Sequence, residues 1–581
     1  MYRYERYLRP DRGLFPLSEL ASRSAADFGD LPIMRRWNGD GYSEITYNEF
    51  ADQVHAIARW LLDNGIVSGD RISLLAENRP EWGMVYLGVQ AAGAIIVPVD
   101  SMMPASGIRH IIANSESRFL FCSEKYHKAV SELAPITTLE KIICMDNLEN
   151  PEVIPFSSVV QNGRKSSTPL PKREMDELAA IIYTSGTTGH SKGVMLTQAN
   201  LMTNVAAASR ILPLGTSDTY LSVLPMHHTY ECTTGFLLPV YCGCSITYSR
   251  SLKSTELLDD MRRTNVTIMV AVPLLYEKMY EGMVRKLSKA PLATRALLGV
   301  LFGLSRFFAK FGIRAGKVLL KSLREKAGMG SVIFFVSGGG PLDPRVADFF
   351  SILGINSMQG YGLTETSPLT HVNLPQVPDN VTVGPPIIGV EQRIDNPNSE
   401  GIGEIVLRGP NIFKGYYKND EATKEALTED GWFHTGDLGK IHSNDFLQIT
   451  GRMKNMLVTA GGKNVYPEEI EHFLNRSSFI AESLVLGIQR ASGYGEEVAA
   501  LIYPDYEQLD LYFEEKGSKP NDEDVAKLIK AEIKEAQKNL QDYKRIHRFR
   551  LMEEEFQKTS TRKIKRYLYS GDMVGVNGEN V

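Results

Sequence analysis

A stretch of glycine and hydroxyl residues between Tyr183 and Gly193 is the part of the sequence best suited to bind a polyphosphate. It follows the apolar run Leu178–Ile182 and contains one cation, Lys192. Glycines let backbone N–H groups approach an anion, hydroxyls add hydrogen bonds and the lysine adds a positive charge. A Walker A loop needs Gly before its Lys and Ser or Thr after it, whereas here Ser191 precedes the lysine and a glycine follows. The spacing therefore argues against a P-loop kinase, and a plain flexible linker is the simpler alternative.

The segments around this loop alternate between helix-like and strand-like runs. Before it, Tyr47 to Asn64 has apolar residues at helical spacing, and Arg71 to Ala76 is typical of a short buried strand. After it, Val266 to Ala271 is rich in β-formers, and Pro273 suits the first turn of a following helix. A further apolar run, Val332 to Val336, leads into three glycines. This alternation predicts an α/β fold with sheets covered by helices on both faces.

The composition changes near residue 380, where proline and glycine become frequent and short strands such as Gly403 to Arg408 follow. We therefore expect a β-rich subdomain over about 380–451 at the end of a large N-terminal lobe, 1–451. After a boundary near Gly451 to Lys454, the strand Glu482 to Leu486 and a helix that begins at Asp522 predict a smaller α+β unit.

The overall composition is that of a globular protein, with 581 residues, 43% hydrophobic residues, 23% charged residues and a net charge of −5. A nucleic-acid binder would show a basic balance, so we expect no nucleic-acid partner. The five cysteines do not have zinc-site spacing, which favours free thiols in a reducing compartment such as the cytoplasm. The first residues lack the apolar region of a secretion signal, and no window of about 18 uninterrupted apolar residues occurs, so we expect no membrane span.

One segment, 295–326, combines apolar residues with basic ones, and no acidic residue occurs from Arg295 to Arg324. Its basic residues are Arg295, Arg306, Lys310, Arg314, Lys317, Lys321 and Arg324. Such a segment can lie on an anionic membrane surface, or it can form helices packed on the protein with a solvated basic face. The sequence leaves both interpretations open.

Six motifs in this order resemble the adenylate-forming superfamily, which includes acyl-CoA synthetases, firefly-type luciferases and peptide-synthetase adenylation domains. The motifs are Tyr183–Gly193, Gln359–Thr366, Thr435–Asp437, Gly451–Lys454, Gly461–Glu471 and Lys558–Arg566. The resemblance extends from about Ile45 to Arg566. It implies a large lobe of doubly covered sheets, a β-rich subdomain and a small mobile α+β domain, and it implies that ATP activates a carboxylic acid.

The resemblance also implies which residues bind ATP and Mg²⁺. The ATP phosphates would contact Thr184, Ser185, Gly186, Thr187, Thr188, Gly189 and Lys192. Glu365 would ligate Mg²⁺ with help from Thr184. The base and the α-phosphate would lie against Gly338, Gly339, Gly340, Gln359, Gly360, Tyr361, Gly362 and Thr364. Asp437 would accept hydrogen bonds from the ribose hydroxyls, with Arg452 beside it.

The remaining implied roles concern catalysis and the second substrate. Lys563 would neutralise charge while the acyl-adenylate forms, and His228 would border the acyl carboxylate. A hinge at 452–454, centred on Lys454, would let the C-terminal domain, 455–581, turn between two half-reactions. The thiol of coenzyme A would then approach past Gly461, Gly462 and Lys463. The sequence departs from the family pattern at Arg562, where glycine is usual, and at Ser191, where proline is usual.

The motifs fix the chemistry more firmly than the substrate. The segment 295–326 resembles the long-chain acyl-CoA synthetase branch, which favours a fatty acid of medium to long chain, with ATP and coenzyme A as the other substrates. An acyl carrier protein is an alternative thiol acceptor, and a non-catalytic nucleotide sensor is an alternative function. We expect a cytoplasmic protein, with peripheral contact of 295–326 on the inner face of a membrane as an open alternative.

Overall fold

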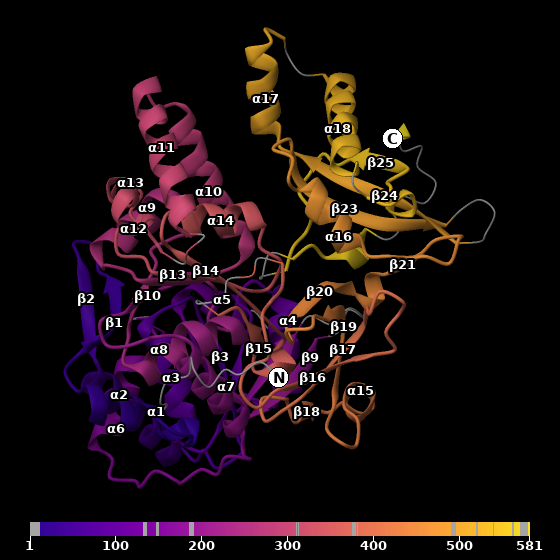
Figure 1. The fold of residues 1–581 in the computed structure, drawn as a ribbon. Coiled ribbons are helices and arrows are strands. Elements are labelled where there is room, and N and C mark those ends of the chain that lie inside the picture. Colours follow the sequence, from indigo (N-terminus) through magenta and orange to yellow (C-terminus); the bar gives the residue numbers. More distant parts are fainter. Residues whose placement is uncertain are drawn as a thin grey trace. The chain divides into compact units, whose positions relative to one another are not determined.

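The computed structural model describes residues 12–580 apart from 132–135, 147–149, 185–190, 310, 312, 375–378, 380, 490–494, 519–520, 539, 560–562 and 570–578. The chain divides into two compact units (Figure 1). Unit 1 comprises Met1–Gln392, Leu407–Phe433 and His442–Leu447, and unit 2 comprises Arg393–Val406, His434–Ile441 and Gln448–Val581. The division into a lobe 1–451 and a mobile domain 455–581 concerns which parts of the chain move relative to each other, and it stays a prediction.

The first large sheet of unit 1 is a mostly parallel sheet. Among the described residues it has the order β15-β14-β13-β12-β10-β11-β1-β2. Its strands are β1 (Pro32–Trp37), β2 (Tyr42–Thr46), β10 (Thr219–Ser222), β11 (Ser245–Tyr248), β12 (Ile268–Ala271), β13 (Phe334–Ser337), β14 (Asn356–Gly362) and β15 (Leu369–Val372). Neighbouring strands are parallel except at the two edges, where β15 and β2 run antiparallel to their neighbours. A parallel interior of this kind agrees with the predicted α/β fold.

The second large sheet of unit 1 carries the glycine-rich loop. Its strands, as far as the chain is described, have the order β18-β9-β8-β4-β3-β5-β6-β7. They are β3 (Arg71–Leu75), β4 (Ile95–Pro98), β5 (Phe119–Cys122), β6 (Lys141–Cys144), β7 (Ile154–Pro155), β8 (Leu178–Thr184), β9 (Lys192–Thr197) and β18 (Gly415–Tyr416). Pairing from β8 to β7 is parallel, whereas β8, β9 and β18 pair antiparallel. The loop therefore joins two adjacent antiparallel strands.

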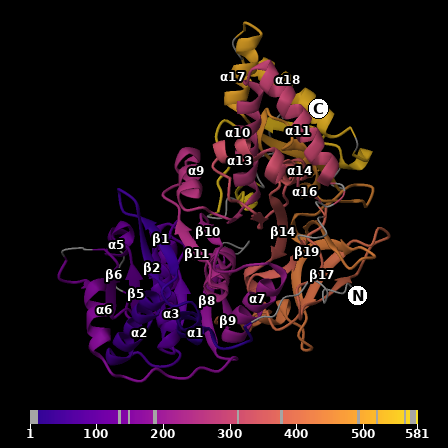
Figure 2. The ribbon, with the colours of Figure 1, turned by 60° about the vertical axis from the view of Figure 1, so that its left-hand side comes forward.

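Helices cover these sheets, and α2 packs against both α3 and α6 (Figures 1 and 2). The longer described helices of unit 1 are α1 (Leu20–Phe28), α2 (Tyr47–Asp63), α3 (Pro80–Ala91), α4 (Ala105–Asn114), α5 (Glu124–Ser131), α6 (Phe156–Lys165), α7 (Gln198–Ile211), α9 (Ser254–Arg263), α10 (Pro273–Ser288), α11 (Leu292–Ala309) and α14 (Pro344–Ile352). The predicted helix from Tyr47 is confirmed, and Thr46 caps it in a reciprocal arrangement with Glu49. Pro273 does begin α10, as its fixed φ angle favours.

Unit 2 contains its own hydrophobic core. Its described sheets have the orders β16-β17-β19-β20, β21-β22 and β23-β24-β25-β26. The strands are β16 (Glu391–Asp395), β17 (Gly403–Arg408), β19 (Phe433–Ile441), β20 (Leu447–Arg452), β21 (Leu457–Val458), β22 (Asn464–Val465), β23 (Ile480–Gln489), β24 (Glu496–Pro504), β25 (Arg548–Leu551) and β26 (Glu579–Asn580). The helices are α16 (Pro467–Leu474), α17 (Tyr506–Glu515) and α18 (Asp522–Ala536). Ile529 and Ile533 of α18 are fully buried with Val485 of β23, which confirms the predicted α+β unit.

The segment 295–326 is helical but does not form one uniform basic surface. It contains most of α11, then α12 (Gly316–Leu319) and α13 (Lys321–Lys326). Arg324, which the sequence places among the surface cations, is only 1% exposed. Its guanidinium donates hydrogen bonds to the carbonyl oxygens of Met329, Gly330, Val332 and Leu353. The assignment of Arg324 to a basic surface was therefore wrong, because backbone carbonyls satisfy the buried group. Lys310 lies outside the described residues.

Candidate active site

The residues at the two ends of the glycine-rich loop stand opposite each other in the sheet. In the antiparallel register of β8 and β9, Thr184 stands opposite Lys192. Both side chains therefore belong to the same end of the sheet, as a phosphate-binding role would require. The intervening candidates Ser185, Gly186, Thr187, Thr188 and Gly189 lie outside the described residues.

A tyrosine connects Lys192 to Glu365. The ammonium of Lys192 lies 4.9 Å from the ring centroid of Tyr416, and the Tyr416 hydroxyl donates a hydrogen bond of 2.8 Å to Oε1 of Glu365. Burial and the neighbouring carboxylate hold the pKa of Tyr416 well above its usual range, so the phenol stays protonated and acts as the donor. The sequence analysis missed Tyr416, because strand β18 joins β9 from more than two hundred residues away and no motif marks it.

The residues proposed for Mg²⁺ offer the donors that such an ion prefers. Glu365 supplies a carboxylate and Thr184 a hydroxyl, and both are oxygen ligands. The bond from Tyr416 orients the carboxylate from outside, as outer hydrogen bonds commonly do for metal-ligating groups. The backbone N–H of Phe413 also donates to the carbonyl oxygen of Glu365 at 2.9 Å, which fixes the position of its backbone. The site therefore fits a hard divalent cation.

The two glycine-containing motifs predicted to lie against the nucleotide meet at one edge of the first sheet. Ser337 of β13 pairs with Gln359 of the parallel strand β14, so Gly338–Gly340 and Gln359–Gly362 emerge side by side. A Cβ at Gly338 would lie 2.7 Å from the ring of Tyr230, and therefore only glycine fits there without a shift. Oε1 of Gln359 accepts the N–H of Leu342 at 3.1 Å, which ties the end of the first motif to the second.

Tyr361 has a histidine neighbour that the sequence did not reveal. Its ring centroid lies 6.0 Å from that of His371, and its carbonyl oxygen accepts a hydrogen bond from Thr370 at 3.0 Å. His371 is completely buried, and desolvation lowers its pKa to about 4, so its ring is neutral at physiological pH. One ring nitrogen is 3.0 Å from Oγ1 of Thr370 and the other is 2.9 Å from Oε1 of Gln392. These two bonds fix His371, and its ring in turn packs beside Tyr361, the aromatic residue predicted to stack on the base. Thr364 begins the short 3-10 helix that contains Glu365.

His228 belongs to a small polar group instead of standing alone. Its ring centroid is 4.3 Å from that of His227, whose Nε2 lies 3.2 Å from Oδ1 of Asp100. His227 is 4% exposed, and Asp100 also accepts the backbone N–H of Met102 at 2.8 Å. One potential ligand atom from each of the three residues lies within 4.8 Å of the other two. The sequence analysis selected His228 and missed the acid–histidine pair that supports it.

Unit 2 brings three of the predicted residues into one charged group. Nε of Arg452 lies 2.8 Å from Oδ1 of Asp437, which is 4% exposed. The Asp437 backbone N–H donates to Oγ1 of Thr435 at 3.0 Å, which fixes the turn that carries the carboxylate. Desolvation lowers the pKa of Lys563, the nearby Arg452 guanidinium lowers it further, and Asp437 raises it. Arg562, before Lys563, lies outside the described residues.

The predicted hinge and coenzyme A residues are exposed parts of unit 2. Lys454 belongs to a short 3-10 helix, Met453–Asn455, directly after β20. Gly461, Gly462 and Lys463 form the exposed turn between β21 and β22. The N–H of Thr459 donates to the Lys463 carbonyl oxygen at 3.0 Å and closes this turn. The hinge and thiol roles of these residues stay predictions.

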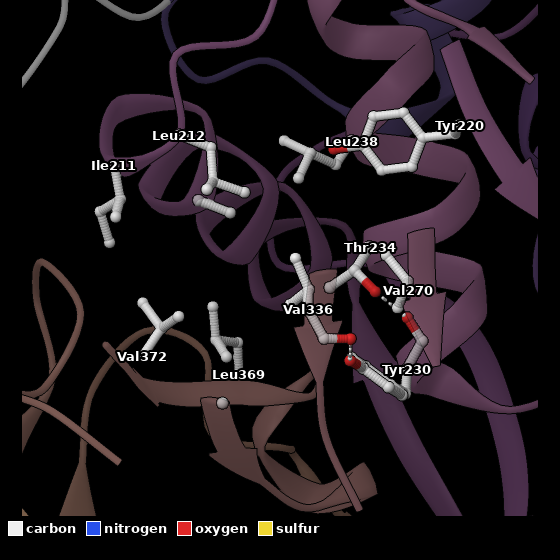
Figure 3. A pocket seen from close by; sticks show the side chains of 12 residues that line it. Ile211, Leu212, Tyr220, Tyr230, Thr234, Leu238, Val270, Val336, Leu369 and Val372 are labelled. Atoms are coloured by element: carbon white, nitrogen blue, oxygen red, sulfur yellow. Dashed lines mark hydrogen bonds between the residues drawn. The ribbon is translucent and has the colours of Figure 1, made fainter. Parts of the chain in front are cut away.

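An apolar cavity of about 30 Å³ lies inside unit 1, next to the predicted nucleotide segment (Figure 3). Its lining residues are Ala208, Ile211, Leu212, Tyr220, Tyr230, Thr234, Leu238, Val270, Val336, Gly360, Leu369 and Val372. Tyr230 donates its hydroxyl to the Val336 carbonyl oxygen at 3.0 Å, so its polar atom is satisfied and its ring faces an apolar space. Because Gly360 lines the cavity and belongs to the nucleotide segment, an apolar ligand here would lie beside that segment.

The chain matches two known protein families along most of its length. The family described as "AMP-binding enzyme" matches residues 21–417, and the one described as "AMP-binding enzyme C-terminal domain" matches residues 454–570. The chain belongs to the AMP-binding enzyme family. It is therefore an adenylate-forming ligase, and the resemblance inferred from the six motifs is confirmed.

Relatives of this AMP-binding enzyme include the peroxisomal long chain acyl-CoA synthetase 7 of Arabidopsis thaliana, 30% identical over 85% of this chain and 74% of the relative. A long-chain-fatty-acid–CoA ligase of Mycobacterium bovis is 29% identical over 93% of this chain and 92% of the relative. Among solved structures, an anthranilate CoA ligase in complex with anthranoyl-AMP has a TM-score of 0.77 at 18% identity, covering 96% and 97% of the two chains. A Mycobacterium tuberculosis fatty acyl CoA synthetase has a TM-score of 0.66 at 21% identity, covering 96% and 98%. These similarities confirm the adenylate-forming fold.

Proposed function

We propose that this ligase joins a fatty acid of medium to long chain to coenzyme A through an acyl-adenylate, with release of pyrophosphate and AMP. The observation that carries the proposal is the apolar cavity bordered by Gly360, beside the segment predicted to bind the nucleotide. Its volume of about 30 Å³ is too small for a long chain, so lining side chains must move when the acid binds. Each methylene buried there would gain about 0.8 kcal/mol, which favours longer acids. The long-chain relatives support the same substrate class.

In the first half-reaction a carboxylate oxygen attacks the α-phosphorus of ATP, and the bond to the β-phosphate oxygen breaks. The products are the mixed anhydride and pyrophosphate. Lys192 and the hydroxyl of Thr184 are proposed to hold the departing phosphates, while Glu365, oriented by Tyr416, would hold Mg²⁺. That ion would supply positive charge against the developing negative charge.

The charged group of unit 2 would serve the ribose and the reacting carboxylate. Asp437 would accept hydrogen bonds from the ribose hydroxyls on its two oxygens, and the ion pair with Arg452 would orient that carboxylate. Lys563 would contribute a cation to the carboxylate and the α-phosphate. His228, supported by His227 and Asp100, would border the acid.

In the second half-reaction the sulfur of coenzyme A attacks the acyl carbon and AMP leaves, while the thiol proton passes to solvent. We propose that the turn Gly461–Lys463 borders the path of the thiol and that rotation at Lys454 separates the two steps. Lys454→Pro should then impair the two half-reactions unequally, measured as pyrophosphate release and as thioester formation from supplied acyl-AMP. Equal rates in Lys454→Pro and the parent protein would contradict the hinge.

The decisive experiment measures pyrophosphate release from ATP with acids from acetate to oleate, each with and without coenzyme A. We expect release to depend on the acid, to be highest for medium to long chains, and to give acyl-CoA when the thiol is present. Pyrophosphate release with acetate, but with none of the longer acids, would contradict the chain-length proposal. No release with any acid would contradict catalysis and favour the nucleotide sensor.

A carrier protein is the second candidate acceptor. A chloroplastic long-chain-fatty-acid–[acyl-carrier-protein] ligase of Arabidopsis thaliana is 28% identical over 84% of this chain and 76% of the relative. The same assay with phosphopantetheinylated carrier protein in place of coenzyme A separates the acceptors, because only the preferred thiol becomes acylated at a high rate. The free thiols found for the five cysteines support the cytoplasm as the proposed location.

A further inference from the structure

One face of α11 is anchored in unit 1. Ser305 is 2% exposed and donates its hydroxyl to the carbonyl oxygen of Ile352 at 2.6 Å. The ring of Phe302 stacks on Phe349 of α14 with centroids 5.7 Å apart, and Leu298 and Leu301 pack against the same core. The helix is therefore fixed on the fold along this face.

The rest of α11 exposes large apolar side chains. Only 6% of its 18-residue window is buried, although its mean hydropathy is 1.4, enough by length and composition alone to cross a membrane. We call the exposed set the apolar ridge: Leu292, Leu297, Val300, Leu304, Phe307, Phe308, Phe311 and Ile313. The exposed fraction is 60% for Leu297 and 55% for Phe307, and the Phe307 and Phe311 rings contact each other at 5.3 Å. A contiguous exposed apolar patch of this kind indicates a surface that binds a membrane or another protein.

The charged residues within the segment from Leu292 to Arg324 are all cations. No Asp or Glu occurs from Leu292 to Arg324. Arg295 and Arg306 are exposed on the same helix, and Lys317 and Lys321 are exposed in the next turns. Apolar side chains with exposed arginines on the same helix complement the acyl boundary and headgroups of an anionic bilayer. Two copies of the ridge facing each other would instead bring like charges together.

We propose that the apolar ridge inserts into the surface of an anionic lipid bilayer and holds the protein there peripherally. The helix lies along the interface and does not span the membrane, because Leu298, Phe302 and Ser305 must stay packed on unit 1. The expected membrane contact of 295–326 is thereby narrowed to the apolar ridge, which ends at Ile313, since Arg324 is buried.

The position of α11 places the proposed membrane contact near the apolar cavity. The helix packs against α14, which follows β13, and Val336 of β13 lines the apolar cavity. In Figure 1, α11 stands above α12 and α14. A bilayer at the ridge would therefore lie close to the elements that surround the cavity. The inference goes beyond the proposed ligation, and binding to lipid can be measured without ATP, acid or thiol.

The test is sedimentation of the full chain with sucrose-loaded vesicles of phosphatidylcholine alone or mixed equally with phosphatidylglycerol. We expect binding to the anionic vesicles that weakens with salt. The triple variant Leu297→Gln, Leu304→Gln, Phe307→Gln should lose at least about tenfold in bound fraction, because it removes the inserted apolar surface. A matched control, Val67→Gln, Met102→Gln, Leu252→Gln, changes equally exposed apolar residues elsewhere and should bind like the parent protein. Replacing Arg295 and Arg306 by Gln should cost about fivefold for each charge.

Three results would overturn the proposal. The parent protein could fail to sediment with anionic vesicles, or the ridge variant could bind as well as the control. The protein could also stay in the pellet after an alkaline carbonate wash, which would indicate a spanning helix. A fall in molar mass by light scattering for the ridge variant, without vesicle binding by the parent, would assign the ridge to a second copy of the chain. Circular dichroism and thermal unfolding of each variant verify that the substitutions leave the fold intact.

Discussion

Each of the two units contains a carboxylate predicted to serve the nucleotide, and each carboxylate is held in a different way. In unit 1, a neutral phenol bonds Glu365 while its ring faces Lys192, so the anion and the cation are held by one uncharged residue. In unit 2, Asp437 is buried against the cation Arg452 directly, with Lys563 nearby.

This difference indicates different tasks. Glu365 accepts a hydrogen bond from a neutral phenol, which orients the carboxylate without supplying a counter-charge and suits a ligand of a divalent ion. The group in unit 2 has two cations and one carboxylate, and its excess positive charge suits an anionic substrate. Substitutions in the two groups should therefore fail in distinguishable ways.

The largest effect is expected for Lys563→Ala. Loss of the cation should lower pyrophosphate release at least about a hundredfold, because charge on the reacting phosphate is no longer stabilised. Thioester formation from supplied acyl-AMP should be spared, as stopped-flow or quenched assays of each half-reaction can measure. Lys565→Ala, two residues away, is the control with a near-normal rate. Equal loss of both half-reactions in Lys563→Ala would refute the role.

Asp437→Asn should raise the KM for ATP about 10- to 100-fold, since hydrogen bonds to a charged group are worth about 1.5–3 kcal/mol. The substitution also leaves Arg452 without its buried partner. Steady-state kinetics with varied ATP measures the effect. The surface pair of Arg393 and Asp395, 2.9 Å apart in the same unit, provides the control Asp395→Asn, which should leave KM unchanged. A similar KM in both variants would remove Asp437 from the nucleotide site.

Tyr416→Phe tests the group in unit 1 and should have a smaller effect. It removes the bond to Glu365 but keeps the ring beneath Lys192, so the Mg²⁺ concentration for half-maximal rate should rise about tenfold while the KM for ATP at saturating Mg²⁺ changes little. Titration of the rate with Mg²⁺ measures it, and Tyr417→Phe is the matched neighbour. An unchanged Mg²⁺ dependence would show that the phenol does not support a metal ligand.

The smallest effects should appear in the pH dependence of pyrophosphate release. A lysine is charged below its pKa, and because the pKa of Lys563 is lowered, the rate should fall with rising pH below the ordinary value of 10.5. Arg452 lowers this pKa and Asp437 raises it. Arg452→Gln should therefore move the alkaline limb to higher pH, and Asp437→Asn should move it to lower pH. If both substitutions moved the alkaline limb of the rate in the same direction, Lys563 would not be the group that titrates there.

The sequence predicted much of this arrangement because local signals carry it. Amphipathic spacing and Thr46 define α2, the apolar run before Gly338 marks strand β13, and the motif that begins at Gln359 marks the end of strand β14. What the sequence did not reveal depends on pairing between distant strands. Tyr416 reaches Glu365 because β18 joins β9, and Asp100 reaches His227 across 127 residues. Contacts between residues so far apart in the chain leave no helical or strand-like spacing in the sequence.

In two helices the burial of side chains could not be foreseen from local sequence. Arg324 has lysine, serine and glutamate neighbours typical of a solvated helix, yet carbonyl groups of a following segment enclose it. Conversely, Arg295 and Arg306 interrupt the apolar residues of α11, so the expectation of no membrane span stays a prediction, but the sequence did not reveal how much of this helix is exposed. Burial of a helix depends on what the rest of the chain places against it, and that information is not local.

The buried guanidinium of Arg324 also determines how the insertion can be engineered. The four carbonyl partners of the guanidinium all follow Arg324 in the sequence, so exchanges upstream of Leu320 leave these bonds in place, whereas a deletion that reaches Arg324 would deprive four backbone oxygens of their donor. A lysine there has too few donors to replace it. Any minimal version of the enzyme, or any chimera that swaps this region between relatives, must therefore keep the arginine and place its junction before α13.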